Sequence, residues 1–192
     1  MIPTRMSLPA LLLTFTLFST QSARADAYMV DPIHSTGVFR IHHFNAGYIW
    51  GLIAGPTGEF VYDPADPSKL SFNVSVPLAN LDTHNERRDN DLRGPDWFNA
   101  KQFPTIDFKS TSVKKTGDTS YEVTGDLSLH GVTKSITLTM EMTGTGKGMM
   151  GETRAGFEST FTIKRADFDM KAMPKGVGDD VTITVALEGV RH

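Results

Sequence analysis

The sequence of 192 residues contains no cysteine. This absence excludes disulfide bonds, thiol catalysis and thiolate metal sites, so the core must hold the fold without covalent cross-links. It also excludes a lipidated cysteine behind an export signal. The sequence lacks H-E-x-x-H spacing, a G-x-S-x-G elbow and a glycine-rich phosphate loop between a strand and a helix. We therefore predict no catalytic residue, no metal ligand and no covalent cofactor.

A long apolar run is also missing, and the one apolar run near the N-terminus is short. It covers residues 8–18, follows Arg5, and is shorter than the ~20 residues of a spanning helix. The segment Ala23-Arg24-Ala25 then has the form of a signal peptidase site. We expect residues 1–25 to be a cleaved signal peptide and residues 26–192 to be one exported domain, periplasmic or secreted.

The chain has no basic surplus. Two of the 19 basic residues and none of the 22 acidic residues lie in residues 1–25, which leaves 17 basic against 22 acidic residues and a formal net charge of −5. Such a chain has no evident electrostatic attraction to nucleic acid. We predict no nucleic-acid partner.

What the sequence does contain is alternation of apolar and polar residues, which is typical of half-buried strands. The clearest runs are 70–76, 121–129, 136–142, 157–163 and 181–188, and weaker ones are 37–44, 48–53, 58–63 and 105–114. Turn residues separate them, and Gly144 to Gly151 has the composition of a flexible loop. About eight or nine strands with one apolar face each indicate an all-β sandwich or barrel.

One polar segment interrupts this pattern. Thr83 followed by Glu86 has the form of a capping box, and Arg93-Gly94-Pro95 is a stop signal. We predict a short helix at about 83–93, with a further turn at 96–99, lying across one end of a barrel. Its anchors would be Leu81, Leu92, Trp97 and Phe98.

Several ordered motifs make the chain resemble one known family. They are Asp31-x-x-His34-Ser35, Phe39-Arg40-Ile41-His42-His43, Leu81-Asp82-Thr83-x-Asn85-x-x-Arg88-Asp89, Phe108-Lys109-Ser110-Thr111, Val123 to Lys134, Arg154-Ala155-Gly156-Phe157 and Leu187-Glu188-Gly189-Val190. Together they resemble the YceI-like polyisoprenoid-binding proteins over nearly the whole of residues 26–192.

The resemblance implies an extended antiparallel eight-stranded, lipocalin-like barrel with an apolar interior. It also implies a periplasmic location, a homodimer, and a bound long-chain isoprenoid such as an isoprenoid quinone or a polyprenyl phosphate. A barrel of eight strands has room for a packed interior or for one ligand. The candidates for lining an apolar tunnel are Phe39, Ile41, Phe60, Phe72, Val74, Phe108, Leu127, Leu138, Phe161 and Ile183, and ordinary core packing is the alternative for each.

Four polar residues are candidates for a headgroup site at the mouth. His43 shares a strand face with Phe39 and Ile41 and could hydrogen-bond a quinone carbonyl, or could be satisfied by protein groups. Arg88 could clamp a phosphate, whereas a structural ion pair of Arg88 and Asp89 that holds the helix to a strand end is the favoured interpretation. His34 is the fourth candidate, with a positioning role beside Asp31.

Three functions remain open from the sequence. The favoured one is an isoprenoid carrier or sequestering protein without enzymatic activity. The second is an accessory of respiratory electron transfer that presents a bound quinone to a membrane cytochrome in transient contact. The third is a barrel enzyme that acts on a hydrophobic substrate.

Overall fold

The structure is a computed structural model that describes residues 26–192. In it, the segments of alternating apolar and polar residues form antiparallel strands. Successive side chains of a strand point to opposite faces, so each strand can bury one face. The strands are β1 (Asp26–Val30), β2 (Thr36–His43), β3 (Gly47–Ala54), β4 (Thr57–Tyr62), β5 (Ser71–Pro77), β6 (Leu81–Asp82), β7 (Thr105–Lys115), β8 (Ser120–Leu129), β9 (Val132–Lys147), β10 (Thr153–Lys164) and β11 (Val177–Arg191). The helices are α1 (Glu86–Arg93) and the 3-10 turns η1 (Pro67–Lys69), η2 (Leu78–Asn80) and η3 (Arg165–Phe168). The predicted signal peptide and its cleavage site lie outside the described residues.

The strands close into a barrel. Going round the ring, β1 pairs with β4, and the order continues through β5, β7, β8, β9, β10 and β11, which returns to β1. All of these pairings are antiparallel. The prediction of a closed, eight-stranded antiparallel barrel with one short helix is therefore confirmed.

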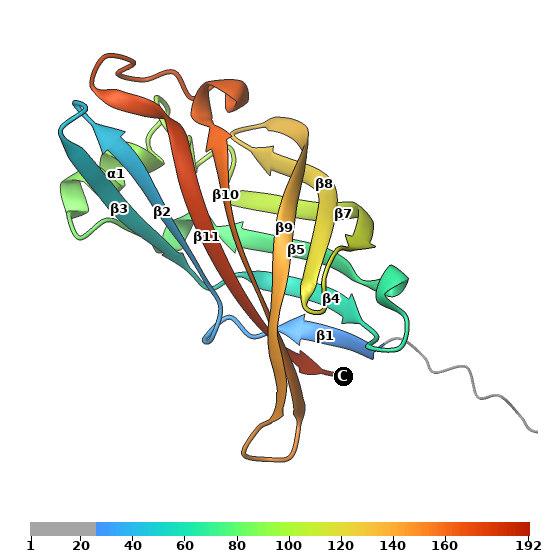
Figure 1. Cartoon of the computed structure of the whole chain (residues 1–192). Coiled ribbons are helices and arrows are strands. Elements are labelled where there is room, and N and C mark those ends of the chain that lie inside the picture. The colour runs from blue at the N-terminus through green and yellow to red at the C-terminus, as the bar shows by residue number, and fades with distance from the viewer. Residues whose placement is uncertain (1–25) are drawn as a thin grey trace, which may run out of the picture.

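The barrel has two corners, one between β1 and β2 and one between β3 and β4, and they divide it into two halves. β1 and β2 lie end to end along β11, β1 against residues 189–191 and β2 against residues 177–186. Their partners follow the same path, because β4 pairs with β1 and β3 pairs with β2. Beyond the corners, β2 and β3 lean away from β5 toward the end of the barrel where α1 lies (Figure 1). We call this end the mouth end, and the opposite end, formed by β1 and β4, the closed end.

The helical segment fills the gap that the corners leave. Ile53 of β3, Leu78 of η2 and Leu81 of β6 are buried together, and Leu92 of α1 and Phe98 pack against them. Leu81, Leu92 and Phe98 thus act as the anchors expected of them. The helix itself begins later than predicted: its N-cap is Asn85, whose side chain accepts a hydrogen bond from the backbone N–H of Arg88.

Three further details differ from the prediction. β1 and the two-residue β6 were not expected. The segment 144–147, expected to be a flexible loop, is the end of β9 and pairs with residues 153–156 of β10, so only residues 148–152 form the turn. Backbone hydrogen bonds between the two antiparallel strands hold this segment extended despite its glycines.

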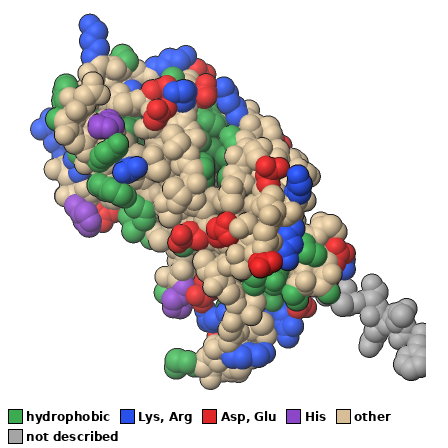
Figure 2. Space-filling view, in the orientation of Figure 1, with side chains coloured by type: hydrophobic (Ala, Val, Ile, Leu, Met, Phe, Trp, Pro, Cys, Tyr) green, Lys and Arg blue, Asp and Glu red, His purple; other side chains and the backbone are tan. Residues whose placement is uncertain are grey.

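The outer surface carries charges of both signs, scattered over the face shown in Figure 2 without a large patch of either sign. This agrees with the small net charge of the chain. Within residues 26–192, no helix is long and apolar enough to cross a membrane.

Candidate apolar cavity

A cavity of about 350 Å³ occupies the mouth half of the barrel. It lies between β2, β3 and β11 on one side and β5, β7, β8, β9 and β10 on the other, and α1 borders its open end. Its lining is almost wholly apolar. The size falls within the range of about 300–1,000 Å³ that is typical of small-molecule sites.

Nine of the ten residues predicted to line a tunnel border this cavity. They are Phe39, Ile41, Phe72, Val74, Phe108, Leu127, Leu138, Phe161 and Ile183. Many inward residues of β2 and β11 are only half-buried, because they face the hollow instead of another side chain. These positions show which residues a ligand in the barrel would meet.

The tenth residue, Phe60, lies elsewhere. Its side chain is fully buried at the closed end, stacked on Tyr28 with 5.1 Å between ring centroids and edge-on to Phe157 at 5.3 Å. β4 belongs to the part of the barrel below the corner, where the interior is filled. The expectation that Phe60 lines a tunnel is corrected: it is a core residue.

Glycines opposite two phenylalanines help to keep the cavity open. Gly51 is the cross-strand partner of Phe39, and a Cβ at Gly51 would lie 2.2 Å from the Phe39 ring. A Cβ at Gly125 would lie 2.5 Å from the ring of Phe108. Each ring therefore occupies the space that a side chain at the glycine would take.

The polar lining is confined to the mouth end. His43 borders the cavity, is exposed, and packs edge-on against Phe44 with 4.6 Å between ring centroids. His42 also borders it, and its Nδ1 is buried without a hydrogen-bond partner among the described residues. Its side chain lies on the strand face opposite to that of His43 and packs against Tyr48 with 4.0 Å between ring centroids, so the His42 ring is on the outer side of β2.

Arg88 borders the cavity as well, but its hydrogen bonds are structural. Its Nε donates to Oγ1 of Thr83 at 2.7 Å, and its Nη2 donates to the Thr83 carbonyl at 2.6 Å. Asp89 is buried, does not border the cavity, and accepts from the N–H and hydroxyl of Thr83 at 2.9 and 2.5 Å. Both residues thus bind one strand-end residue and fix the helix, although not through an ion pair with each other.

Sequence reasoning missed Arg165, a buried cation at the mouth end of the cavity. Its side chain is 4% exposed and donates to the carbonyls of Gly178, Met170 and Val177. Burial lowers the pKa of this guanidinium, and the nearby charge of Asp179 opposes the shift. The alternation of β10 could have indicated Arg165, because the inward positions 161 and 163 continue to residue 165.

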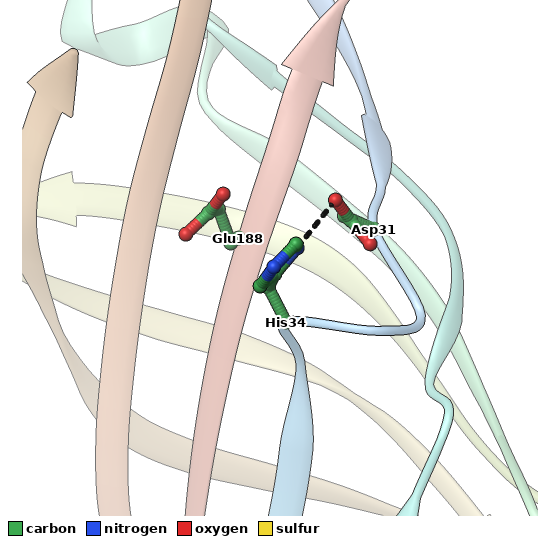
Figure 3. A group of neighbouring side chains, drawn as sticks. All are labelled: Asp31, His34 and Glu188. Atoms are coloured by element: carbon green, nitrogen blue, oxygen red, sulfur yellow. Dashed lines mark hydrogen bonds and ion pairs between the residues drawn. The ribbon is translucent and has the colours of Figure 1, made fainter. Parts of the chain in front are cut away.

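His34 lies far from the mouth, which corrects its expected position. It pairs with Asp31 through Nδ1 at 2.8 Å, on the connection between β1 and β2, beside Glu188 of β11 (Figure 3). Possible metal-binding atoms of Asp31, His34 and Glu188 lie within 4.8 Å of one another. Arg154, however, donates to both carboxylates, so its guanidinium supplies the positive charge at this point. The cluster ties β10 and β11 to the β1–β2 corner.

Comparison with known proteins agrees with this architecture. A family model described as the YceI-like domain matches residues 28–189. UPF0312 protein plu2095 of Photorhabdus laumondii is 39% identical over 92% of each chain, and Protein YceI of Escherichia coli O157:H7 is 36% identical over 98% of this chain and 99% of its own.

Two solved structures share the fold. Burkholderia cenocepacia BcnA has a TM-score of 0.73 at 24% identity, over 83% of this chain and 98% of its own. A polyisoprenoid binding domain from Saccharophagus degradans, implicated in plant cell wall breakdown, has a TM-score of 0.66 at 14% identity, over 86% of this chain and 98% of its own. At these identities the two structures support the assignment of the fold and nothing further. The match of the family model to most of the chain, together with the two close relatives, shows that this protein belongs to the YceI-like domain family.

Proposed function

We propose that this protein binds the tail of a long-chain isoprenoid in its barrel and carries or sequesters that lipid after export, without chemical turnover. The observation that carries the proposal is the hollow mouth half, whose lining is apolar except at its open end. The Saccharophagus degradans domain, described as polyisoprenoid binding, has the same fold. The signal peptide predicted from the sequence of residues 1–25 supports a periplasmic or secreted location.

Apolar burial is sufficient for useful affinity. Each buried methylene contributes about 0.8 kcal/mol, and an isoprenoid unit carries five carbons. A few units in the cavity would give about micromolar affinity after the entropic loss of association. The pocket is near the small end of the usual range, so it suits one tail and leaves the headgroup at the mouth.

The polar residues of the mouth suit an oxygen-bearing headgroup. The exposed ring of His43, which borders the cavity, could accept or donate one hydrogen bond. Arg165 adds positive charge but is engaged by three carbonyls. A quinone carbonyl or a phosphate oxygen both fit this chemistry.

The test is mass spectrometry of an organic extract from protein purified after export in a bacterial host. We expect a stoichiometric polyprenyl or quinone species, and its headgroup would decide between a lipid carrier and a quinone-presenting accessory of electron transfer. The matched control is a variant with a filled cavity, Ile183→Trp, which should yield the same fold and no lipid. An empty parent protein that also fails to take up added isoprenoids would overturn the proposal.

A further inference from the structure

Exposed apolar side chains gather next to the mouth. They are Phe44 of the β2–β3 turn, Tyr48 and Trp50 of β3, and Met173 of the connection between η3 and β11, and we call them the rim patch. Phe44 is 60% exposed, Trp50 57% and Met173 52%. Hydrophobic side chains gather over β2 and β3 in Figure 2. Contiguous exposed apolar surface of this kind marks an interaction site.

The tip of the patch is continuous with the cavity. The N–H of Phe44 donates to the carbonyl of Gly176 at 2.7 Å, which joins the two mouth loops. A Cβ at Gly176 would meet the Phe44 ring at 3.1 Å and Cε of Met173 at 3.3 Å, so both side chains flank this glycine. Met173 also borders the cavity, and so does His43, the neighbour of Phe44. One surface therefore runs from the outside of the rim into the lumen.

The backbone at the tip is unusual for large apolar residues. Phe44 has φ 48° and Met173 has φ 45°, both in the left-handed region that favours glycine and asparagine. Folding gains little from an exposed phenylalanine or methionine in such a conformation. Their packing within the molecule gives little return for this backbone conformation, which points to a contact outside the molecule.

The flank of the patch combines aromatic rings with a cation. Tyr48 and Trp50 share the outer face of β3, and the guanidinium of Arg40 lies 4.6 and 5.7 Å from their ring centroids. Amphipathic aromatic side chains and a long cationic one are the residues found at membrane–water interfaces. Among residues 26–192, nothing pairs with the edge of β3 over residues 47–51, since β6 pairs only with Leu52 and Ile53.

We propose that the rim patch docks the mouth onto the surface of a phospholipid bilayer, so that the ligand passes between bilayer and cavity without crossing water. The inference rests on the proposed function in one respect: an isoprenoid is held in an apolar phase before it is bound. The bilayer is favoured as the occupant because the patch and the lipid-sized lumen form one apolar surface. Residues 26–192 carry a formal net charge of −5, so apolar insertion, not attraction to anionic lipid, would drive the contact.

The test uses ligand-free phosphatidylcholine vesicles and measures cosedimentation of the purified protein. The rim variant is Phe44→Asn with Met173→Asn, and asparagine tolerates the left-handed backbone at both positions. The matched control is Met149→Asn with Met150→Asn, because these two methionines are exposed in the β9–β10 turn at the closed end. We expect the partition coefficient of the rim variant to fall at least about tenfold, from the apolar area removed, and that of the control to stay unchanged.

A second measurement locates the contact. Trp50 and Trp97 are the two tryptophans of the chain, so Trp97→Phe leaves Trp50 as the only indole. Its emission should shift to the blue with vesicles and be quenched by brominated lipid. Binding should depend weakly on salt, as apolar contacts do.

Three results would overturn the proposal. They are no vesicle binding by the parent protein, equal loss in the rim and control variants, or a change of oligomeric state in the rim variant without any vesicle binding, which would assign the patch to a second copy of the chain. Uptake of an isoprenoid from detergent micelles keeps the two proposals separate. If uptake succeeds and docking fails, isoprenoid binding is supported and bilayer docking is overturned. If docking succeeds and uptake fails, bilayer docking is supported and isoprenoid binding is overturned.

Discussion

The two ends of this barrel share most of their strands, yet one is filled and the other is hollow. At the closed end, the rings of Tyr28, Phe60, Tyr62, Phe72, Tyr121 and Phe157 meet one another, and all are buried. At the mouth end, the inward side chains are mostly aliphatic and face a cavity of about 350 Å³. Contacts between aromatic rings therefore fill the closed end, whereas the rings that border the cavity leave space beside them.

The corners between β1 and β2 and between β3 and β4 explain this difference. Below them, β1 and β4 lie within the ring, and Tyr28 and Phe60 reach the centre. Above them, β2 and β3 lean outward, and the gap is covered by α1 and its flanking turns. The closed half thus contributes most to stability and the mouth half to binding. Substitutions in different halves of one strand should therefore affect the free energy of unfolding and the ligand affinity separately.

The largest expected effect comes from a matched pair on β10. Phe157 and Phe161 face inward four residues apart, but Phe157 is 1% exposed among four aromatic rings, whereas Phe161 borders the cavity. Phe157→Ala should lower the free energy of unfolding by about 3–5 kcal/mol, the usual loss for a buried phenylalanine. Phe161→Ala should lower it by less than about half of that, because no close packing is lost on its cavity side. Urea denaturation of both variants measures the difference, and equal losses would contradict the division into two halves.

Filling the hollow end should remove binding while leaving stability nearly unchanged. Ile183→Trp adds volume in the middle of the cavity, between Phe39 and Phe161 of the neighbouring strands. We expect affinity for a fluorescent polyprenol analogue to fall at least about a hundredfold, equivalent to about 2.7 kcal/mol, because the tail loses its space. The melting temperature should change by a few degrees at most, since the new ring enters existing space.

The control for this variant is the adjacent outward residue. Thr184 faces the outside of β11, where its hydroxyl lies 2.8 Å from that of Thr160. Thr184→Trp adds the same ring to the same strand and should leave affinity unchanged. Equal affinity in Ile183→Trp and the parent protein would show that the cavity is not the binding site.

The periodicity of the sequence was enough to predict the strands, but not which half of the barrel each residue occupies. Phe39 and Phe60 both appear as inward aromatic residues of short alternating runs, and only the corners separate them. His34 illustrates the same limit. Its motif precedes a strand, but nothing local indicates that the strand starts at the closed half and runs toward the mouth.

The helix shows a competition that local rules cannot resolve. Thr83 and Glu86 have capping-box spacing, yet Asp89 takes both the N–H and the hydroxyl of Thr83. His84 adopts φ 59°, and the helix begins after Asn85. A buried carboxylate six residues away therefore outweighed the local signal, and tertiary contacts of this kind are invisible in a single sequence.

The acidic cluster at the β1–β2 corner predicts how the filled half responds to pH. The hydrogen bond with His34 holds the pKa of Asp31 well below its usual range, with burial opposing and bonds from the Ile33 N–H and from Arg154 assisting. Because the pKa is lower in the folded state, the contribution is complete above about pH 4 and is lost as the pH falls toward the folded value. Asp31→Asn should lower stability by roughly 1–2 kcal/mol at pH 7 and flatten the acid limb of the stability curve. An unchanged slope of melting temperature against pH below 5 would contradict this assignment.

The smallest expected effect tests whether the two halves open independently. Oδ1 of Asn85 caps α1 by accepting from the N–H of Arg88 at 2.9 Å, and loss of an N-cap costs about 1 kcal/mol. Asn85→Ala should therefore reduce hydrogen-exchange protection in α1, while Arg87→Ala, at an exposed position within the same helix, should not. Since α1 covers only the mouth end, protection of the amides around Phe157 should stay at the parent level. If protection there falls by the same factor, the filled and hollow halves form one cooperative unit, and ligand entry then requires opening of the whole barrel and not of its mouth alone.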